Sequence, residues 1–446
     1  MTGSMSAGPD ALLEALERHW GSRQFRPKQR EIIEAVLAGR DVAVVMPTGG
    51  GKSLCYQMPA LFRPGTAVVV SPLIALMKDQ VEQLNKRGIP AAALNSHTPY
   101  PEQQRLRREI RQGRLRLLYL APERLLREQT VELIRQTPVS YFAIDEAHCI
   151  SEWGHEFRPD YRRLAELRAW HPQAPLLALT ASATRRVRHD ILEQLQMRDP
   201  AKFIRSFERA NLRYLVRQTA EDTQPDLLEA ALGAHPGSSV IVYGATVALV
   251  EETAAALNRR GIAAVAYHAR LPNTERRSAQ ERWMAGSPSV LVGTIAFGMG
   301  IDKPDVRAVI HLSLPKSLEQ YYQEAGRAGR DGLPSDCLLA WQPRDLGILA
   351  YFLKKISDPL EQRRAWRRYD DIRRYADGFT CRHVVICRHF GELAHSRLCG
   401  MCDICGPIPD WFERTGRNAG VTLSSAAARS RGAARRPPRR NNPPSA

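Results

Sequence analysis

The residues best suited to chemistry lie in Thr48-Gly49-Gly50-Gly51-Lys52-Ser53, close to the start of the chain. Glycines allow backbone N–H groups to converge on a polyphosphate without Cβ clashes, and a following helix N-terminus adds partial positive charge. Lys52 would bridge the β- and γ-phosphates of ATP, and the Ser53 hydroxyl would ligate Mg²⁺. The strict phosphate-loop pattern has glycine where Met46 stands. The alternative is a surface glycine turn followed by a chance Gly-Lys-Ser.

A pair of carboxylates stands in Asp145-Glu146-Ala147-His148, directly after the apolar run Tyr141–Ile144. We expect Asp145 to hold Mg²⁺, directly or through water, and Glu146 to orient and polarise the attacking water. His148 would link this site to the rest of the protein. The tetrapeptide alone is weak evidence. After a strand, and downstream of a phosphate loop, it indicates ATP hydrolysis.

Five of the eight cysteines crowd one region, as Cys381, Cys387, Cys399, Cys402 and Cys405. In a reducing compartment such crowding favours a metal over disulfides. The C-x-x-C-x-x-C run with Cys381 upstream supplies four thiolates, the number that a tetrahedral Zn²⁺ site needs. The same spacing also allows iron–sulfur ligation, so the residues alone leave the metal open.

Aromatic side chains recur at helical spacing as Trp153, Phe157 and Tyr161, with His155 and Arg158 among them. Aromatic residues dominate cores, so by themselves these three favour a core stripe. The competing interpretation is a platform on which the bases of a single strand stack, with arginine beside it.

The elements that must position these residues alternate between short apolar runs and helical stretches, which predicts parallel sheets covered by helices. Ligands of such sheets bind at the carboxyl ends of strands, where the motifs above stand. We therefore predict an α/β fold of two tandem parallel-sheet domains, then a small helical metal-binding subdomain and a disordered basic tail. The expected strands are 41–45, Ala67–Val70, Ala91–Leu94, Leu115–Leu120, Tyr141–Ile144, Leu176–Leu179, Val240–Tyr243, Ala263–Tyr267, Val290–Gly293, Ala308–His311 and Ser335–Trp341. The expected helices include 11–20, 27–38, Ile74–Lys86, Pro101–Arg111 and Asp345–Ile356.

We place the domains at 1–208, 209–342, 343–406 and 407–446. The second sheet is expected to begin near Ala220, after a polar linker at Thr219–Gln224. Two tandem units imply a cleft between them, and Arg327 and Arg330 would reach it on a helix of the second unit. An arginine on the far wall stabilises the transferring phosphate, an effect of about 10³–10⁵ in rate. We expect Arg330 in that role with Arg327 in support; the alternative is two surface arginines.

The amino-acid composition indicates which kinds of partner the chain can bind. The chain has 446 residues, a formal net charge of +17 and a pI near 9.8, which favours an anionic polymer. The alternative is that the arginine excess reflects genome composition only. No apolar run approaches the ~20 residues of a membrane span, and the first residues lack a signal peptide. We expect a cytoplasmic, nucleoid-associated protein with no membrane partner.

Taken together, the motifs resemble the RecQ family of DNA helicases, within helicase superfamily two. The resemblance runs from about Phe25 to about Cys405 and includes a phosphate loop and Asp-Glu-Ala-His. Its other specific parts are Ser71–Gln80, Cys149–Tyr161, Leu179–Thr184, Thr294–Pro304 and Gln323–Gly332. Membership would imply an ATP-dependent helicase that translocates 3′ to 5′ on single-stranded DNA and unwinds duplex DNA in recombination and repair. The alternatives are a DNA-stimulated ATPase that unwinds poorly and an ATP-switched DNA-binding or strand-annealing protein.

The resemblance also assigns residues. It implies two tandem RecA-like domains followed by a zinc-binding subdomain. It also implies that Gln29 reads adenine, that the aromatic-rich loop Trp153–Tyr161 senses single-stranded DNA, and that the four-cysteine metal is structural zinc, with Cys387 a free thiol in a helix. The ATP-binding set is Phe25, Arg26, Gln29, Thr48, Gly49, Gly50, Gly51, Lys52, Ser53, Gly300 and Asp302. The DNA-binding and coupling set is Ser71, Pro72, His148, Trp153, His155, Phe157, Arg158, Thr180 and Thr294. The zinc ligands are Cys381, Cys399, Cys402 and Cys405, and the magnesium ligands Ser53 and Asp145.

The end of the sequence departs from the family pattern. Gly406–Ala446 is too short and too rich in Pro, Ala and Arg for the winged helix that typically follows, so we expect a disordered basic tail. The winged helix normally splits the duplex, and its absence would weaken processive unwinding but not ATP hydrolysis. We expect a monomer that meets single-stranded and duplex DNA, with single-strand-binding or repair proteins as further partners.

Overall fold

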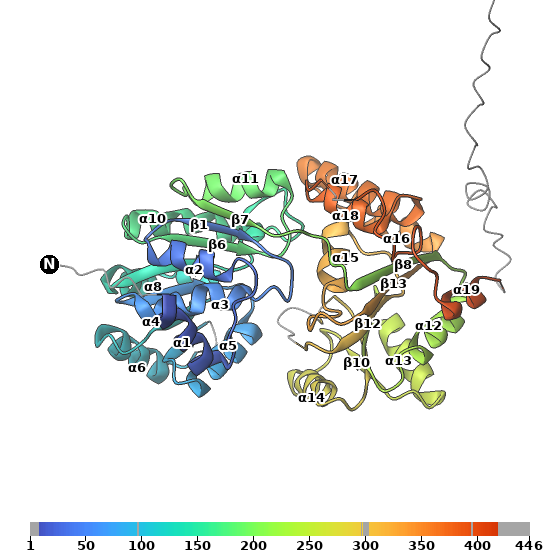
Figure 1. Cartoon of the computed structure of the whole chain (residues 1–446), viewed down its shortest axis with the longest axis horizontal. Helices are drawn as coiled ribbons and strands as arrows, with labels where there is room; N and C mark the ends of the chain where they lie inside the picture. Colours follow the sequence, from blue (N-terminus) through green and yellow to red (C-terminus); the bar gives the residue numbers. More distant parts are fainter. Residues whose placement is uncertain (1–8, 96–97, 296, 298–302, 394–395, 418–446) are drawn as a thin grey trace, which may run out of the picture.

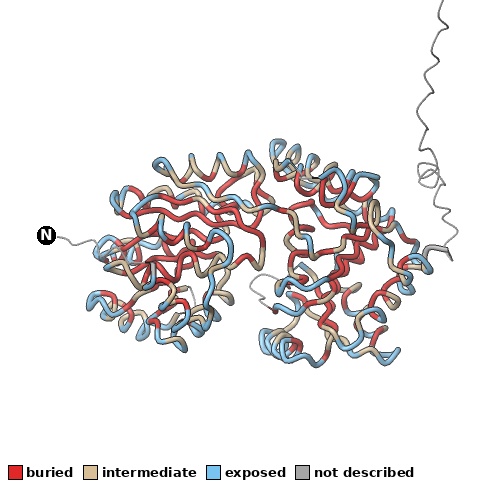
Figure 2. Tube along the Cα trace, in the orientation of Figure 1, coloured by how far each residue is buried: buried red, intermediate tan, exposed pale blue. Residues whose placement is uncertain are grey.

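The computed structural model describes residues 9–95, 98–295, 297, 303–393 and 396–417. Two sheet units lie side by side, and helices α17 (Pro359–Asp377) and α18 (Arg382–His389) lie above the second unit in this view (Figure 1). Helix α11 (Arg185–Gln194) of the first unit is hydrogen-bonded to the segment directly after α18. In both units the strands form the buried centre, and most exposed positions lie on the surrounding helices and loops (Figure 2). No helix of the described residues is long and apolar enough to cross a membrane.

The first sheet has seven parallel strands in the order β3-β4-β2-β5-β6-β1-β7. Six of them confirm predicted strands. The seventh, β7, was missed because it is a short edge strand whose exposed Lys202 interrupts the apolar pattern. The strands are β1 (Val42–Val45), β2 (Thr66–Val70), β3 (Ala91–Leu94), β4 (Leu117–Leu120), β5 (Val139–Ile144), β6 (Leu176–Thr180) and β7 (Ala201–Ile204).

Helices cover both faces of this sheet, and their apolar sides fill two buried clusters. The α-helices are α1 (Pro9–Trp20), α2 (Gln29–Leu37), α3 (Lys52–Gln57), α4 (Pro59–Phe62), α5 (Ile74–Lys86), α6 (Tyr100–Arg111), α7 (Pro122–Leu125), α8 (Glu128–Gln136), α9 (Pro159–Arg162), α10 (Glu166–Trp170) and α11 (Arg185–Gln194). Two 3₁₀ turns follow β5 and α9, as η1 (Ala147–Ile150) and η2 (Arg163–Ala165).

The second sheet has six parallel strands in the order β10-β11-β9-β12-β13-β8. Its first strand in the chain is β8, so the expectation that this sheet begins near Ala220 was wrong. Two arginines disguised β8 in the sequence: Arg213 pairs with Asp336 on β13, and Arg217 lies over Phe412. The strands are β8 (Leu212–Gln218), β9 (Ser239–Tyr243), β10 (Ala264–Tyr267), β11 (Val290–Gly293), β12 (Val306–His311) and β13 (Ser335–Trp341). Its helices are α12 (Gln224–Gly233), α13 (Val247–Arg259), α14 (Asn273–Met284) and α15 (Leu318–Ala325).

The remaining helices are α16 (Pro343–Lys354), α17 (Pro359–Asp377), α18 (Arg382–His389) and α19 (Asp410–Arg417). Helix α19 corrects the expectation that everything after 406 is disordered. Phe412 is buried in the core beside Leu227 and Leu228 of α12, and the Arg217 guanidinium lies 3.8 Å from the centre of its ring. The composition of the whole tail concealed this anchor; residues 418–446 lie outside the described part of the chain.

Candidate active site and metal centre

The phosphate loop connects the carboxyl end of β1 to α3. Gly49 and Gly51 have φ of 77° and 82°, which an L-residue with a side chain adopts only with strain. A Cβ on Gly50 would lie 2.4 Å from Cγ of Met46. Met46 is fully buried, so it occupies the space beneath the loop that the strict motif leaves to glycine. Lys52 donates to the Met46 carbonyl over 3.1 Å, and burial lowers the pKa of Lys52.

Gln29 at the start of α2 holds the same loop from the side. Its Nε2 donates to the Gly51 carbonyl over 3.0 Å, and its Oε1 accepts from the Arg26 backbone N–H over 2.8 Å. Arg26 in turn donates from its side chain to the Gly49 carbonyl. The predicted adenine reader and the loop that would hold the phosphates are thus in direct contact.

The carboxylate pair stands where β5 ends. Asp145 is buried, its N–H donates to the Val70 carbonyl over 2.8 Å, and its carbonyl accepts from Tyr161 over 3.1 Å. Burial, with repulsion from Glu146, raises the pKa of Asp145 to about 7. Glu146 has a φ of 47°, a left-handed conformation that turns the chain into η1. A bound cation would favour the ionised form of Asp145, so the buried acid suits a metal ligand.

Arg327 and Arg330 reach this site from the second unit. Helix α15 ends at Ala325, so both arginines lie in the turn that follows it and not on the predicted helix. A Cβ on Gly49 would lie 3.0 Å from Cγ of Arg330, which places that side chain against the phosphate loop. A cleft of about 470 Å³ separates the two walls. Among the residues that line it are Arg26, Thr48, Gly49, Gly51, Lys52, Ser53, Pro72, Asp145, Glu146, Gln323, Arg327 and Arg330.

Arg209 is a site residue that the sequence did not reveal. Its guanidinium donates to the Thr48 carbonyl of the phosphate loop over 3.1 Å, and to the Ala328 and Gly329 carbonyls over 3.2 and 3.1 Å. One side chain therefore joins the phosphate loop to the turn that carries both arginines. It stands in the connection between the sheets and belongs to no motif.

A buried chain of side chains leads away from the carboxylates. His148 Nδ1 lies 2.9 Å from Thr180 Oγ1, and Thr180 donates its only hydroxyl proton to the Ser182 carbonyl over 3.1 Å. His148 Nδ1 is therefore the donor in the first contact. Across the cleft, Gln323 of α15 donates to Ser182 Oγ over 2.9 Å. The predicted coupling residues His148 and Thr180 are thus connected to the second unit through Ser182.

The charge on His148 follows from its neighbours. Burial by itself lowers the pKa of His148, but contacts with Cys149, Glu146 and Glu156 outweigh it and raise the pKa well above the usual value. Glu146 Oε2 lies 3.3 Å from Nδ1 and Glu156 Oε2 lies 3.7 Å from Nε2. The His155 ring stacks on His148 at 4.7 Å, with 10° between the planes. His148 therefore interacts both with the carboxylate pair, through Glu146, and with the aromatic-rich loop, through His155 and Glu156.

The aromatic-rich loop is not a helix before α9, so the helical spacing of its aromatics was misleading. Tyr161 is fully buried in the core, which is where one of the two interpretations placed all three aromatic residues. Trp153 is half-buried and lies against two guanidinium groups, with Cζ of Arg186 and Arg364 at 3.0 and 4.4 Å from the centre of its ring. Phe157 is exposed, and Arg158 donates weakly to the Pro72 carbonyl over 3.5 Å.

The other predicted residues lie in varied places. Phe25 packs against the N-terminal core cluster beside Leu16 and Met58 and does not line the cleft. Ser71 is buried at the end of β2, and Thr294 directly follows β11. Gly300 and Asp302 lie outside the described residues.

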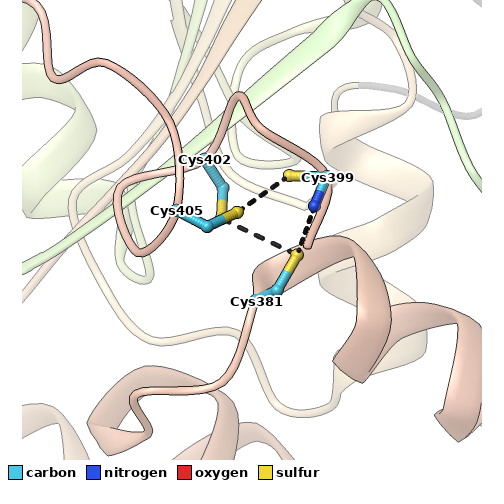
Figure 3. A group of neighbouring side chains, drawn as sticks. All are labelled: Cys381, Cys399, Cys402 and Cys405. Carbon is cyan, nitrogen blue, oxygen red and sulfur yellow. Dashed lines mark hydrogen bonds between the residues drawn. The ribbon is translucent and has the colours of Figure 1, made fainter. Parts of the chain in front are cut away.

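Four cysteine sulfurs converge between α18 and the loop before α19 (Figure 3). The ligand atoms of Cys381, Cys399, Cys402 and Cys405 all lie within 4.8 Å of one another, with three sulfur–sulfur distances of 3.4, 3.5 and 4.0 Å. A tetrahedral ion about 2.3 Å from each sulfur sets the sulfurs about 3.8 Å apart, so the residues fit zinc. Cys387 lies in α18 apart from this cluster, as predicted, and burial raises the pKa of its thiol to about 12.

Three family models match consecutive parts of the chain. A DEAD/DEAH box helicase model matches residues 26–191, a helicase conserved C-terminal domain model matches 223–332, and a RecQ zinc-binding model matches 343–406. The third confirms zinc as the metal expected at the four cysteines.

Curated relatives agree with these models. The chain is 43% identical over 402 residues to the ATP-dependent DNA helicase RecQ of Pasteurella multocida, covering 90% of this chain and 63% of the relative. It is 42% identical over 401 residues to the protein of that name from Haemophilus influenzae, covering 90% and 64%. The chain thus spans a little less than two thirds of the length of these relatives.

Solved structures share the fold. The Mycobacterium smegmatis helicase Lhr, solved with ssDNA and AMP-PNP, superposes with a TM-score of 0.58 at 20% identity, over 77% of this chain and 49% of that one. Saccharomyces cerevisiae Dbp5, solved with RNA and ADP BeF3, gives a TM-score of 0.62 at 17% identity, over 82% and 98%. At these identities the likeness concerns the two-domain RecA-like fold alone.

Proposed function

The chain belongs to the RecQ family of DNA helicases, and on that basis we propose that it is an ATP-dependent motor that translocates 3′ to 5′ on single-stranded DNA. It would separate duplex DNA during recombination and repair, as a cytoplasmic, nucleoid-associated monomer. Its partners would be single-stranded and duplex DNA, with single-strand-binding or repair proteins as further candidates. The boundaries 1–208, 209–342 and 343–406 stand as our proposed division of the motor and zinc-binding parts.

One arrangement supports this proposal above all. The phosphate loop with Lys52 and the carboxylates Asp145 and Glu146 form one wall of the cleft, and Arg327 and Arg330 form the other. A site divided in this way is complete only when the two units are close together. Binding and release of nucleotide would therefore close and open the units, and a grip on DNA can be cycled by that motion.

Each residue has a role in the proposed reaction. Ser53 and Asp145 would hold Mg²⁺, which supplies charge stabilisation to the phosphates when bound. Lys52 would contact the β- and γ-phosphates, and Glu146 would orient the attacking water. Arg330 would stabilise the transferring phosphate and Arg327 would support it. Gln29 would read adenine after exchanging its present contact with Gly51.

The deciding experiment compares unwinding of a 3′-tailed duplex with that of a 5′-tailed duplex, in ATP and Mg²⁺. Unwinding of the 3′-tailed substrate only is expected. Lys52→Ala should lower DNA-stimulated ATP hydrolysis by about 10²-fold or more while leaving DNA binding nearly unchanged. Lys86→Ala is the matched control, because that lysine is exposed on α5 and pairs only with Glu82 among the described residues.

The other outcomes are equally informative. Strong single-strand-stimulated ATP hydrolysis with unwinding of neither substrate would replace the helicase with a translocase that unwinds poorly. Strand annealing that survives Lys52→Ala would favour a DNA-binding protein in which ATP only switches affinity.

A further inference from the structure

Glu152 and Trp153, at the start of the aromatic-rich loop, are held by an arginine from the zinc-binding part of the chain. Arg364 of α17 donates to Glu152 Oε2 over 2.9 Å, and its guanidinium lies 4.4 Å from the centre of the Trp153 ring. The two partners are more than 200 positions from Arg364 in the sequence. Arg364 is 14% exposed, so this is a partly buried contact and not a solvated surface pair.

The ring of Trp153 is occupied by protein in this arrangement. Arg186 of α11 lies 3.0 Å from the ring centre, in addition to Arg364. Guanidinium groups and nucleobases both bind an aromatic ring by stacking on its face. A base that stacks on the part of the Trp153 ring over which an arginine lies must therefore displace that arginine.

Arg364 has a second acceptor to which it can turn. Glu361, one turn earlier on α17, has a carboxylate oxygen 3.8 Å from Arg364, and it also holds Arg368. If Arg364 left Glu152, its charge would therefore still have a partner. An unpaired buried charge is what usually makes it costly to break such an ion pair. Glu152 likewise keeps Arg162, whose guanidinium lies 2.8 Å away.

The held loop is also in contact with the reaction site. Arg158 donates its N–H to the Cys149 carbonyl over 2.9 Å, and His155 and Glu156 both meet His148. His148 contacts Glu146 and Thr180. The loop is therefore in contact with the residues that, in the proposed reaction, surround the attacking water.

We propose that Arg364 is a positioning residue that keeps the aromatic-rich loop closed on Trp153 until single-stranded DNA displaces it. The zinc-binding part thereby restrains ATP hydrolysis in the absence of DNA. This inference rests on the proposed function for its ATPase readout, but the closed loop itself can be measured without nucleotide or DNA.

The test compares the full-length chain with Arg364→Ala, Arg364→Lys, Glu152→Gln and Arg367→Ala. Arg367 is the matched control, because it is exposed on the same helix and forms no ion pair among the described residues. Zinc content and melting temperature, measured first, confirm that each variant is folded. Hydrogen exchange of residues 151–158 without ligand should accelerate in Arg364→Ala and Glu152→Gln, and match wild type in Arg367→Ala.

Measurements of the ATPase rate distinguish release of the loop from a general loss of activity. Arg364→Ala should raise the DNA-free ATPase rate by about fivefold and lower the single-stranded DNA concentration at half-stimulation by a similar factor, the low end for coupled sites. The fully stimulated rate should stay unchanged. Arg364→Lys retains the charge and should return both values at least halfway to wild type.

Other results overturn the proposal. It fails if Arg364→Ala matches Arg367→Ala in exchange and in DNA-free rate, if that rate falls, or if lysine restores nothing. A chain with no ATPase activity would defeat the proposed function instead, and the exchange comparison would still decide whether Arg364 holds the loop.

Discussion

His148 Nδ1 and Thr180 Oγ1 lie 2.9 Å apart, and this buried contact joins the carboxylate motif to the motif that follows β6. Because Thr180 gives its proton to Ser182, it can only accept from the imidazole. Ser182 then accepts from Gln323 across the cleft. A path of three contacts thus connects the carboxylate motif of one unit to α15 of the other.

Thr180→Val should break this path while preserving shape. The substitution removes the acceptor of a buried His148 N–H, which should lower the free energy of unfolding by about 1–3 kcal/mol. We expect DNA-stimulated kcat to fall about tenfold with little change in KM for ATP, because the residue does not line the cleft. Thr180→Ser keeps the hydroxyl and should stay near wild type. Equal losses in both variants would contradict a role for the hydrogen bond.

Arg209→Lys should impair catalysis although it conserves charge. A planar guanidinium donates to several carbonyls at fixed angles, and an ammonium group cannot reproduce that fork. Since Arg209 holds both the phosphate loop and the turn of Arg327 and Arg330, we expect the lysine to lower kcat about tenfold, through loss of about one charge-assisted contact. Steady-state ATP hydrolysis with saturating single-stranded DNA measures it. A normal kcat would show that the arginine turn needs no such support.

Replacing a zinc ligand should release the metal. Cys402→Ser removes one of four thiolates, and bound zinc should fall from about one ion per chain to near zero, with a lower melting temperature, because structural zinc supplies folding energy. Cys387→Ser is the matched control, a buried cysteine outside the cluster, and should retain the ion. Elemental analysis of the purified variants is sufficient. Zinc retained in full by Cys402→Ser would exclude this ligand set.

Asp403→Asn should destabilise the zinc-binding part through a different mechanism. Arg382 donates to both Asp403 oxygens over 2.9 and 2.8 Å, and both side chains are buried. Removing one charge leaves the other buried and unpaired, which costs about 3–5 kcal/mol in free energy of unfolding. Urea unfolding measures this. The exposed pair Arg277–Glu281 provides the comparison, where Glu281→Gln should leave the free energy of unfolding nearly unchanged.

The contact between His389 and Glu319 should make stability depend on pH. Burial alone would lower the pKa of His389 and raise that of Glu319, but their attraction over 2.7 Å outweighs it, raising the first and lowering the second to about 2. The contribution of His389 to the free energy of unfolding is complete below the pKa of the unfolded state, near 6.5. It is lost as pH rises through the higher pKa of His389 in the folded state. The carboxylate contribution is complete above the unfolded pKa near 4.5 and is lost as pH falls toward 2.

His389→Gln should therefore destabilise most between about pH 4.5 and 6.5, by about 2 kcal/mol, and progressively less at higher pH. Urea midpoints of both proteins across pH 5 to 9 give the difference directly. A penalty that is constant over this range would mean that the histidine acts by packing alone.

The sequence by itself determined the chemistry and most of the elements. Phosphate-loop, carboxylate and thiolate residues are contiguous or closely spaced, so local pattern is enough to find them. Predicted strands such as Val290–Gly293 and Ser335–Trp341 were confirmed to the residue because parallel strands buried on both faces read as continuous apolar runs. Strands β7 and β8 escaped because charged residues interrupt their pattern, and α19 because its two aromatics were averaged into a basic tail.

Only the tertiary structure decided which side chains act together. Arg209 and Arg364 carry no local signal for these contacts, since the Thr48 carbonyl and the Glu152 carboxylate lie more than 100 positions away in the chain. The same holds for Trp153, whose ring turned out to be covered by two arginines, and for Tyr161, which the fold buries beneath Asp145. The type and spacing of residues indicate which chemistry a side chain can perform. Contacts between distant segments depend on how two sheets and a metal-bound module pack, and this packing places the arginines opposite the phosphate loop.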